Sequence, residues 1–200
     1  MNALLTVMAA IFVAELTDKD ALLLLSLATR IKPWVVFLAG SVAFTITSAI
    51  IVTLGYFLVS VVPVSLISLA GGLVMIAYGC WSFFQANREE EELAKAERKV
   101  SLKASRSLWL IFVNAVSLLI LLDLAGDATE VLTILFVARF QNVFLVFAGA
   151  VPALVAATAL ETTIGNRLSK ILSSRRIRIF SLIVFLTIGS VAILTTLFHL

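Results

Sequence analysis

Long apolar stretches separated by short polar segments dominate this chain. A helix that crosses a membrane needs about 20 mostly apolar residues, and six stretches of the sequence reach that length. Their approximate bounds are Ala3–Ala28, Trp34–Val61, Val64–Phe84, Leu108–Ala138, Val143–Ile164 and Ile177–Phe198. The pattern predicts an all-α integral membrane protein with six transmembrane helices. The fourth stretch is too long for one straight span, and Gly126 within it predicts a kink, a break or a tilt.

Composition supports the membrane class and narrows the possible chemistry. The chain is 62% hydrophobic and its mean hydropathy is +1.13, whereas a soluble domain is about 45–50% apolar. The single cysteine, Cys80, lies in an apolar stretch, and the single histidine, His199, is the penultimate residue. The sequence therefore argues against a disulfide framework and against a metal site built from thiolates or imidazoles.

Basic residues are concentrated in alternate connections between the predicted spans. Of the 15 Lys and Arg residues, 13 lie in the first, third and fifth connections; the fourth has only Arg139 and the second has none. Because basic loops remain in the cytoplasm, we expect both termini outside. This placement accounts for the net charge of +3, so we expect no nucleic-acid partner. We expect the plasma membrane of a prokaryote, since no organelle-targeting segment is recognisable before the first span.

The two halves of the chain resemble each other. Among the pairs that a shift of 109 positions superposes are Asp18 on Asp127, Arg30 on Arg139, and Gly40 on Gly149. Each half has three predicted spans, so the second half enters the membrane inverted relative to the first, as in many secondary transporters. We expect two inverted three-helix repeats, residues 1–86 and 108–200. The charged segment 87–107 between them is predicted to be a cytoplasmic loop, either a solvated helix or a linker, with a connecting or regulatory role.

Two acidic clusters, residues 15–20 and 123–130, lie inside apolar stretches. A carboxylate at the bilayer centre costs about 2.5–3.5 kcal/mol, so such groups usually mark an ion or substrate pathway. Residues three, four and seven apart share a helix face, which predicts that carboxylates of the first and fourth spans converge. The candidate ligands are Glu15, Asp18, Asp123, Asp127 and Glu130. The residues expected around them are Thr17, Lys19, Asp20 and Thr129.

An all-oxygen site of this kind suits hard divalent cations such as Ca²⁺, Mn²⁺ or Mg²⁺. The alternative is that the acids are structural ions paired with Lys19, Arg30 or Arg139. One lysine cannot neutralise all of them, so some must be protonated or a cation must be bound. Glu161, in the fifth span, is expected either to pair with Arg167 at the membrane boundary or to act as a gate.

The first acidic cluster resembles the signature of a known family. The Golgi, thylakoid and bacterial Mn²⁺/Ca²⁺ transporters form the Ca²⁺:cation antiporter-2 group of the LysE superfamily, and they carry Glu-x-Gly-Asp-Lys/Arg-Ser/Thr once in each half. Glu15, Asp18 and Lys19 match this motif, whereas Thr17 replaces its glycine and Asp20 its hydroxyl residue. The resemblance covers the whole chain, with three spans on either side of a charged loop.

The second cluster matches the same motif less closely. Gly126, Asp127 and Thr129 agree with it. Leu124 stands at the glutamate position, with Asp123 one residue earlier, and Ala128 replaces the basic residue. Glu130 stands where the family often has glutamine. The resemblance therefore implies that Glu15, Asp18 and Asp127 are ligands, while Asp123 and Glu130 are candidates by helical spacing alone.

This resemblance implies a secondary transporter that exports Mn²⁺ or Ca²⁺ in exchange for protons by alternating access. Protons and the cation would compete for the same carboxylates, because a low-dielectric site disfavours uncompensated negative charge. Such a transporter needs no cofactor and is not an enzyme. Its partners would be the lipid bilayer and the divalent cation, with a monomer or a homodimer as the assembly.

Three other functions fit the same sequence. An exporter of a cationic or zwitterionic organic solute, as elsewhere in the LysE superfamily, could pair an amine with the same acids. A membrane scaffold would use the charged segment to dock a soluble partner. A channel is also compatible with inverted repeats, although repeats of this kind favour alternating access.

Overall fold

The computed structural model describes residues 2–17, 19–103, 107–124, 128–171 and 174–198, and the regular structure within these ranges is α-helical. The helices are α1 (Ala3–Leu16), α2 (Lys19–Arg30), α3 (Pro33–Val61), α4 (Val64–Lys103), α5 (Leu108–Asp123), α6 (Ala128–Phe140), α7 (Val143–Ile171) and α8 (Ser174–Leu197). The all-α prediction is thereby confirmed for the described part of the chain.

Four of these helical segments are long and apolar enough to cross a membrane. They are Pro33–Val61, Val64–Phe84, Val143–Thr163 and Ile179–Leu197, close to four of the predicted spans. The predicted fourth span is divided into α5 and α6, which meet at an angle of 63° and count as a fifth candidate if taken together. The predicted first span is divided as well, into α1 and α2.

Local sequence explains where several helices begin and end. Pro33 occupies the first turn of α3, where its missing N–H costs no hydrogen bond and its fixed φ suits the helix. The hydroxyl of Ser107 accepts a hydrogen bond from the Trp109 N–H at the start of α5. Between α6 and α7, Gln141 adopts a positive φ of 49°, and Asn142 Oδ1 accepts from the Leu145 N–H at 3.0 Å. These polar caps satisfy N–H groups that a helix start leaves open.

The segment expected as a charged loop is helical. α4 continues beyond its apolar part, which ends at Phe84, through to Lys103. Of the two alternatives, a solvated helix or a linker, the backbone shows a helix over residues 87–103.

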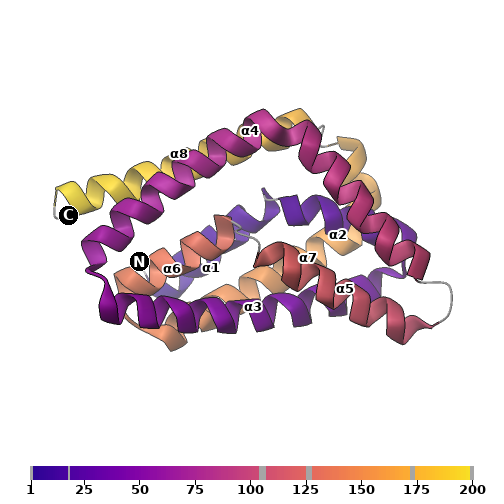
Figure 1. The fold of residues 1–200 in the computed structure, drawn as a ribbon, viewed down its shortest axis with the longest axis horizontal. Helices are drawn as coiled ribbons and strands as arrows, with labels where there is room; N and C mark the ends of the chain where they lie inside the picture. The colour runs from indigo at the N-terminus through magenta and orange to yellow at the C-terminus, as the bar shows by residue number, and fades with distance from the viewer. Residues whose placement is uncertain (1, 18, 104–106, 125–127, 172–173, 199–200) are drawn as a thin grey trace.

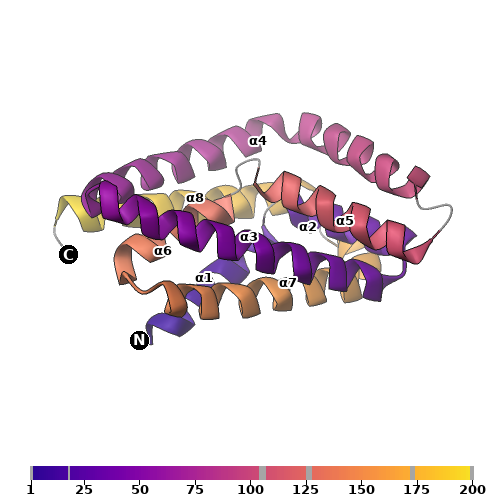
Figure 2. The same ribbon diagram turned by 60° about the horizontal axis from the view of Figure 1, so that its bottom comes forward.

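The helices pack in two groups, which Figures 1 and 2 show from two sides. α4 and α8 lie side by side along one face of the molecule, and the remaining helices form the other group. Within that group α1 packs on α7 as α5 packs on α3, and α2 packs on α7 as α6 packs on α3. Both termini lie at the end of the molecule where α3 meets α4 (Figure 1).

Glycines set the close approach of α4 and α8. A Cβ added to Gly189 would lie 2.6 Å from the backbone oxygen of Gly72 and 2.7 Å from Ile76 Cγ1. A Cβ on Gly72 would lie 2.9 Å from the backbone oxygen of Gly189. Small residues allow such close contact between helices in membranes generally.

The faces turned away from the interior are apolar. Only 22% of the spanning window of α4 and 17% of that of α8 are buried. Large side chains remain exposed on them and on neighbouring helices, among them Phe57, Trp81 and Phe144. A surface of this kind suits hydrocarbon and not water, which supports the membrane class.

We predict that Gly189→Ala destabilises the protein by about 1–3 kcal/mol, because the added methyl group overpacks a backbone contact that cannot move aside. The midpoint of thermal unfolding in detergent measures the effect. Ser190→Ala is the matched control, since Ser190 is exposed on the same helix and its hydroxyl can be removed without a clash. Equal midpoints for the two variants would contradict the close crossing of α4 and α8.

Candidate cation-binding site

Both acidic clusters lie where a helix is interrupted. α1 ends at Leu16 and α2 begins at Lys19, so the first cluster straddles this junction. α5 ends at Asp123 and α6 begins at Ala128, so the second cluster straddles the other. A helix end leaves backbone carbonyl or N–H groups without intrahelical partners. Each interruption therefore places polar backbone beside acidic side chains within an apolar stretch.

Glu15 connects the two halves of the molecule. It lies in the last turn of α1 and is completely buried, with 0% of its surface exposed. Its Oε2 accepts a hydrogen bond from the hydroxyl of Thr129, in the first turn of α6, at 3.1 Å. Thr129 is itself 4% exposed. This contact joins one residue of the first acidic cluster to one residue of the second.

Thr17 terminates α1 and is held from two directions. Its hydroxyl donates to the backbone oxygen of Ala14 at 2.8 Å, and its own N–H also bonds to that oxygen at 3.0 Å. The backbone oxygen of Thr17 accepts a hydrogen bond from the buried hydroxyl of Ser181 in α8. α8 therefore fixes the interrupted segment of the first cluster, although the sequence offered no signal for Ser181, a single serine in an apolar helix.

The other acids of the second cluster lie on either side of its break. Asp123 is the last residue of α5 and only 5% exposed. Glu130 is half-buried in the first turn of α6, where the helix dipole favours negative charge. Among the described residues, no three His, Cys, Asp or Glu side chains form a group that could hold a metal ion.

The remaining candidate residues, or their side chains, lie outside the part of the chain that the structure describes. Asp18 and Asp127 lie outside the described residues, as does Gly126. Lys19 and Asp20 belong to the first turn of α2, and their side chains lie outside the description as well. The convergence of all five predicted carboxylates on one ion therefore stays a prediction.

Glu161 is a further buried acid, on α7. Its side chain is completely buried, with 0% of its surface exposed. The side chain of Arg167, its expected partner at the membrane boundary, lies outside the described residues. The nearby hydroxyls of Thr158 and Thr162 donate to backbone oxygens of their own helix, at 2.8 Å and 2.7 Å. The sequence marks Glu161 as an acid at the end of an apolar stretch, but it gives no signal for the depth of its burial.

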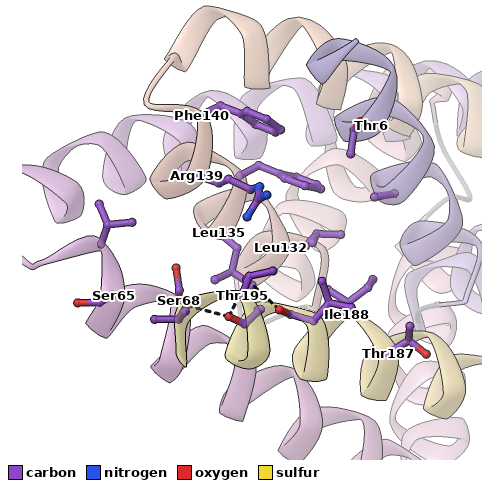
Figure 3. A pocket seen from close by; sticks show the side chains of 16 residues that line it. Thr6, Ser65, Ser68, Leu132, Leu135, Arg139, Phe140, Thr187, Ile188 and Thr195 are labelled. Atoms are coloured by element: carbon purple, nitrogen blue, oxygen red, sulfur yellow. Dashed lines mark hydrogen bonds between the residues drawn. The ribbon is translucent and has the colours of Figure 1, made fainter. Parts of the chain in front are cut away.

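A cavity of about 650 Å³ lies between α1, α4, α6 and α8. Figure 3 shows the side chains that line it. The lining residues are Thr6, Ala10, Val64, Ser65, Ser68, Leu132, Leu135, Phe136, Arg139, Phe140, Thr187, Ile188, Val191, Ala192, Thr195 and Thr196. These belong to the start of α1, the start of α4 and the later parts of α6 and α8, so the cavity lies toward the end of the molecule that carries both termini (Figure 1).

The opposite part of the molecule is closely packed around α2, α3 and α7. A Cβ on Gly40 in α3 would lie 2.8 Å from the side chain of Thr158 in α7 and 3.3 Å from that of Leu24 in α2. Leu24 is completely buried. Among the described residues, the cavity thus lies between Glu15 and Thr129 and the end of the molecule that carries the termini. On the other side of these two residues, toward α2 and α7, the side chains are closely packed.

The chemistry available at Glu15 is that of oxygen donors. A buried carboxylate, a threonine hydroxyl and the carbonyl groups of an interrupted helix can coordinate a hard cation or take up a proton. Neither cysteine nor histidine is found in either cluster, so the soft ligands that select copper or zinc are missing from both.

We predict that Thr129→Val destabilises the protein by about 1–3 kcal/mol, because it leaves a buried carboxylate oxygen without its hydroxyl donor. Thr129→Ser, which keeps the hydroxyl, should recover most of the loss in the thermal unfolding midpoint. Thr133→Val is the matched control, since Thr133 is equally buried but donates only to the backbone oxygen of Thr129. A loss as large in Thr133→Val would show that the contact with Glu15 does not matter.

Comparison with known proteins gives a match to a protein family. A family model described as divalent cation/proton antiporter GDT1 matches residues 3–90 and 111–199. The search of curated proteins and the search of solved structures each find no match. The family match spans both acidic clusters and both halves of the chain.

Proposed function

The chain belongs to the divalent cation/proton antiporter family whose model matches most of its length, and on this premise we propose that it exports Mn²⁺ or Ca²⁺ in exchange for protons. Membership makes it a multi-pass membrane transporter of divalent cations. The choice of Mn²⁺ or Ca²⁺, the direction and the residues that bind the cation belong to the proposal.

One observation carries the assignment of the site: the hydrogen bond between Glu15 and Thr129. It joins the end of α1 to the start of α6, so an ion bound by Glu15 would meet groups from both halves. We propose Glu15, Asp18 and Asp127 as ligands, with Asp123 and Glu130 as further candidates and Thr17, Lys19, Asp20 and Thr129 around them. An interrupted span is where transporters expose backbone carbonyls to ions.

We also propose that the chain is built from two inverted repeats with six spans, residues 1–86 and 108–200, joined by the charged segment 87–107. The packing of the helices supports this arrangement. Exchanging α1 with α5, α2 with α6 and α3 with α7 converts the contact of α1 with α7 into that of α5 with α3. It also converts the contact of α2 with α7 into that of α6 with α3.

In the mechanism we propose, cation and protons compete for one site, and the two halves of the protein then rock to expose that site on the other side of the membrane. Cation and protons compete for the same carboxylates, since two positive occupants of one small site repel each other at low dielectric. The cavity on the terminal side would be the open path, and the contact among Gly40, Thr158 and Leu24 part of the closed one. With basic connections in the cytoplasm of a prokaryotic cell, the cavity faces outward, and the opposite state opens between α2, α3 and α7.

We predict that Glu15→Gln lowers metal-driven proton movement in proteoliposomes by about 10- to 100-fold, the equivalent of losing one interaction with a charged group. Asp18→Asn and Asp127→Asn should lower it comparably. The measurement is proton flux reported by a pH-sensitive dye across a panel of Mn²⁺, Ca²⁺, Mg²⁺ and a cationic amino acid.

Glu90→Gln serves as the control, because Glu90 lies in the charged part of α4 beyond its apolar span and should leave the flux unchanged. Retained metal-driven flux in Glu15→Gln would overturn the site. A flux driven by the amino acid and not by any metal would instead favour the organic-solute exporter.

A further inference from the structure

Arg139 is the only charged side chain among the described residues that line the cavity. It is exposed, and Figure 3 shows its guanidinium reaching into the space between α6 and α8. Within the described part of the chain, it has no ion pair or hydrogen-bonded side chain. A full positive charge therefore stands in the cavity without a described anionic partner.

The same face of α6 links Arg139 to the candidate site. Thr129, Leu132, Phe136 and Arg139 follow one another at intervals of three and four residues, which places them on one side of the helix. Leu132 lines the cavity and is 2% exposed. Thr129, one turn further, holds the carboxylate of Glu15. Ten residues of helix separate Thr129 from Arg139, a rise of roughly 15 Å.

Apart from Arg139, the cavity is lined by apolar side chains and by the hydroxyls of serine and threonine residues. The hydroxyls of Thr187, Thr195 and Thr196 all donate to backbone oxygens of α8. With their hydrogens committed to the helix, these side chains offer oxygen lone pairs to the cavity. Arg139 is thus the one group in the described lining that repels a metal ion.

We propose that Arg139 is a directional element, a fixed charge that slows the return of the exported divalent cation through the outer cavity. This inference rests on the proposed function, because it needs a cation that leaves by this path. The charge does not alter the equilibrium of the exchange, which the ion gradients determine. It raises the apparent KM for cation presented on the cavity side and leaves the KM on the opposite side unchanged, because ions arriving there do not pass it.

The size of the effect follows from Coulomb's law. At low salt, a unit charge acting on a divalent ion that passes it in the cavity at roughly 8–10 Å, in a setting close to that of water, alters association by about two- to five-fold. Replacing the guanidinium by a neutral group should lower the cavity-side KM by that factor. The effect should fall toward none at high ionic strength, because the guanidinium is exposed to solvent.

The test measures the KM for Mn²⁺ or Ca²⁺ on each side, in right-side-out and inverted membrane vesicles, for the wild type and three variants. Arg139→Gln should lower the cavity-side KM by about two- to five-fold, Arg139→Glu by about the square of that factor, and Arg139→Lys should leave it unchanged. Lys32→Gln is the matched control, an exposed cation before α3 that should not affect the cavity-side KM.

The possible results distinguish a failure of this inference from a failure of the proposed transport function. A wild type that moves no divalent cation would refute the proposed function itself. A transporting wild type whose cavity-side KM is the same in Arg139→Gln, or changes equally on both sides, would overturn the role of Arg139 alone. The same holds if the effect appears in phosphatidylglycerol vesicles and disappears in phosphatidylcholine, since Arg139 would then bind an anionic headgroup.

Discussion

The placement of acidic groups inside apolar helices is the constraint on which the rest of this structure depends. A carboxylate in hydrocarbon must be supplied with hydrogen bonds, a proton or a cation. Glu15 is completely buried and receives the hydroxyl of Thr129. That single contact requires the end of α1 to meet the start of α6, and so requires the two halves of the chain to pack against each other.

Interruptions of the helices make this placement possible. A continuous helix would keep its carbonyl groups in internal hydrogen bonds, whereas the junctions after Leu16 and Asp123 release some of them where the acids lie. The hydroxyl of Ser181 holds one such carbonyl, that of Thr17. α8 therefore serves two purposes: it crosses α4 closely at Gly189 and it fixes the segment beside Glu15.

Much of this arrangement could be predicted from the sequence. Apolar length located four spans to within a few residues. Gly126 indicated the break in the fourth span. The break in the first span was missed, because neither glycine nor proline, the residues that usually signal a break, stands near Thr17. Ser181 and the full burial of Glu161 depend on how distant helices pack, which periodicity along a single helix does not encode.

The central claim is that one divalent cation is shared by both halves at the interrupted helices. Anomalous X-ray scattering from crystals grown with Mn²⁺ tests it most directly, because the signal locates the metal independently of its function. The account predicts a peak in contact with the Glu15 carboxylate and with at least one oxygen from residues 123–130. A peak whose ligands all come from one half, or one confined to the membrane surface, would contradict it.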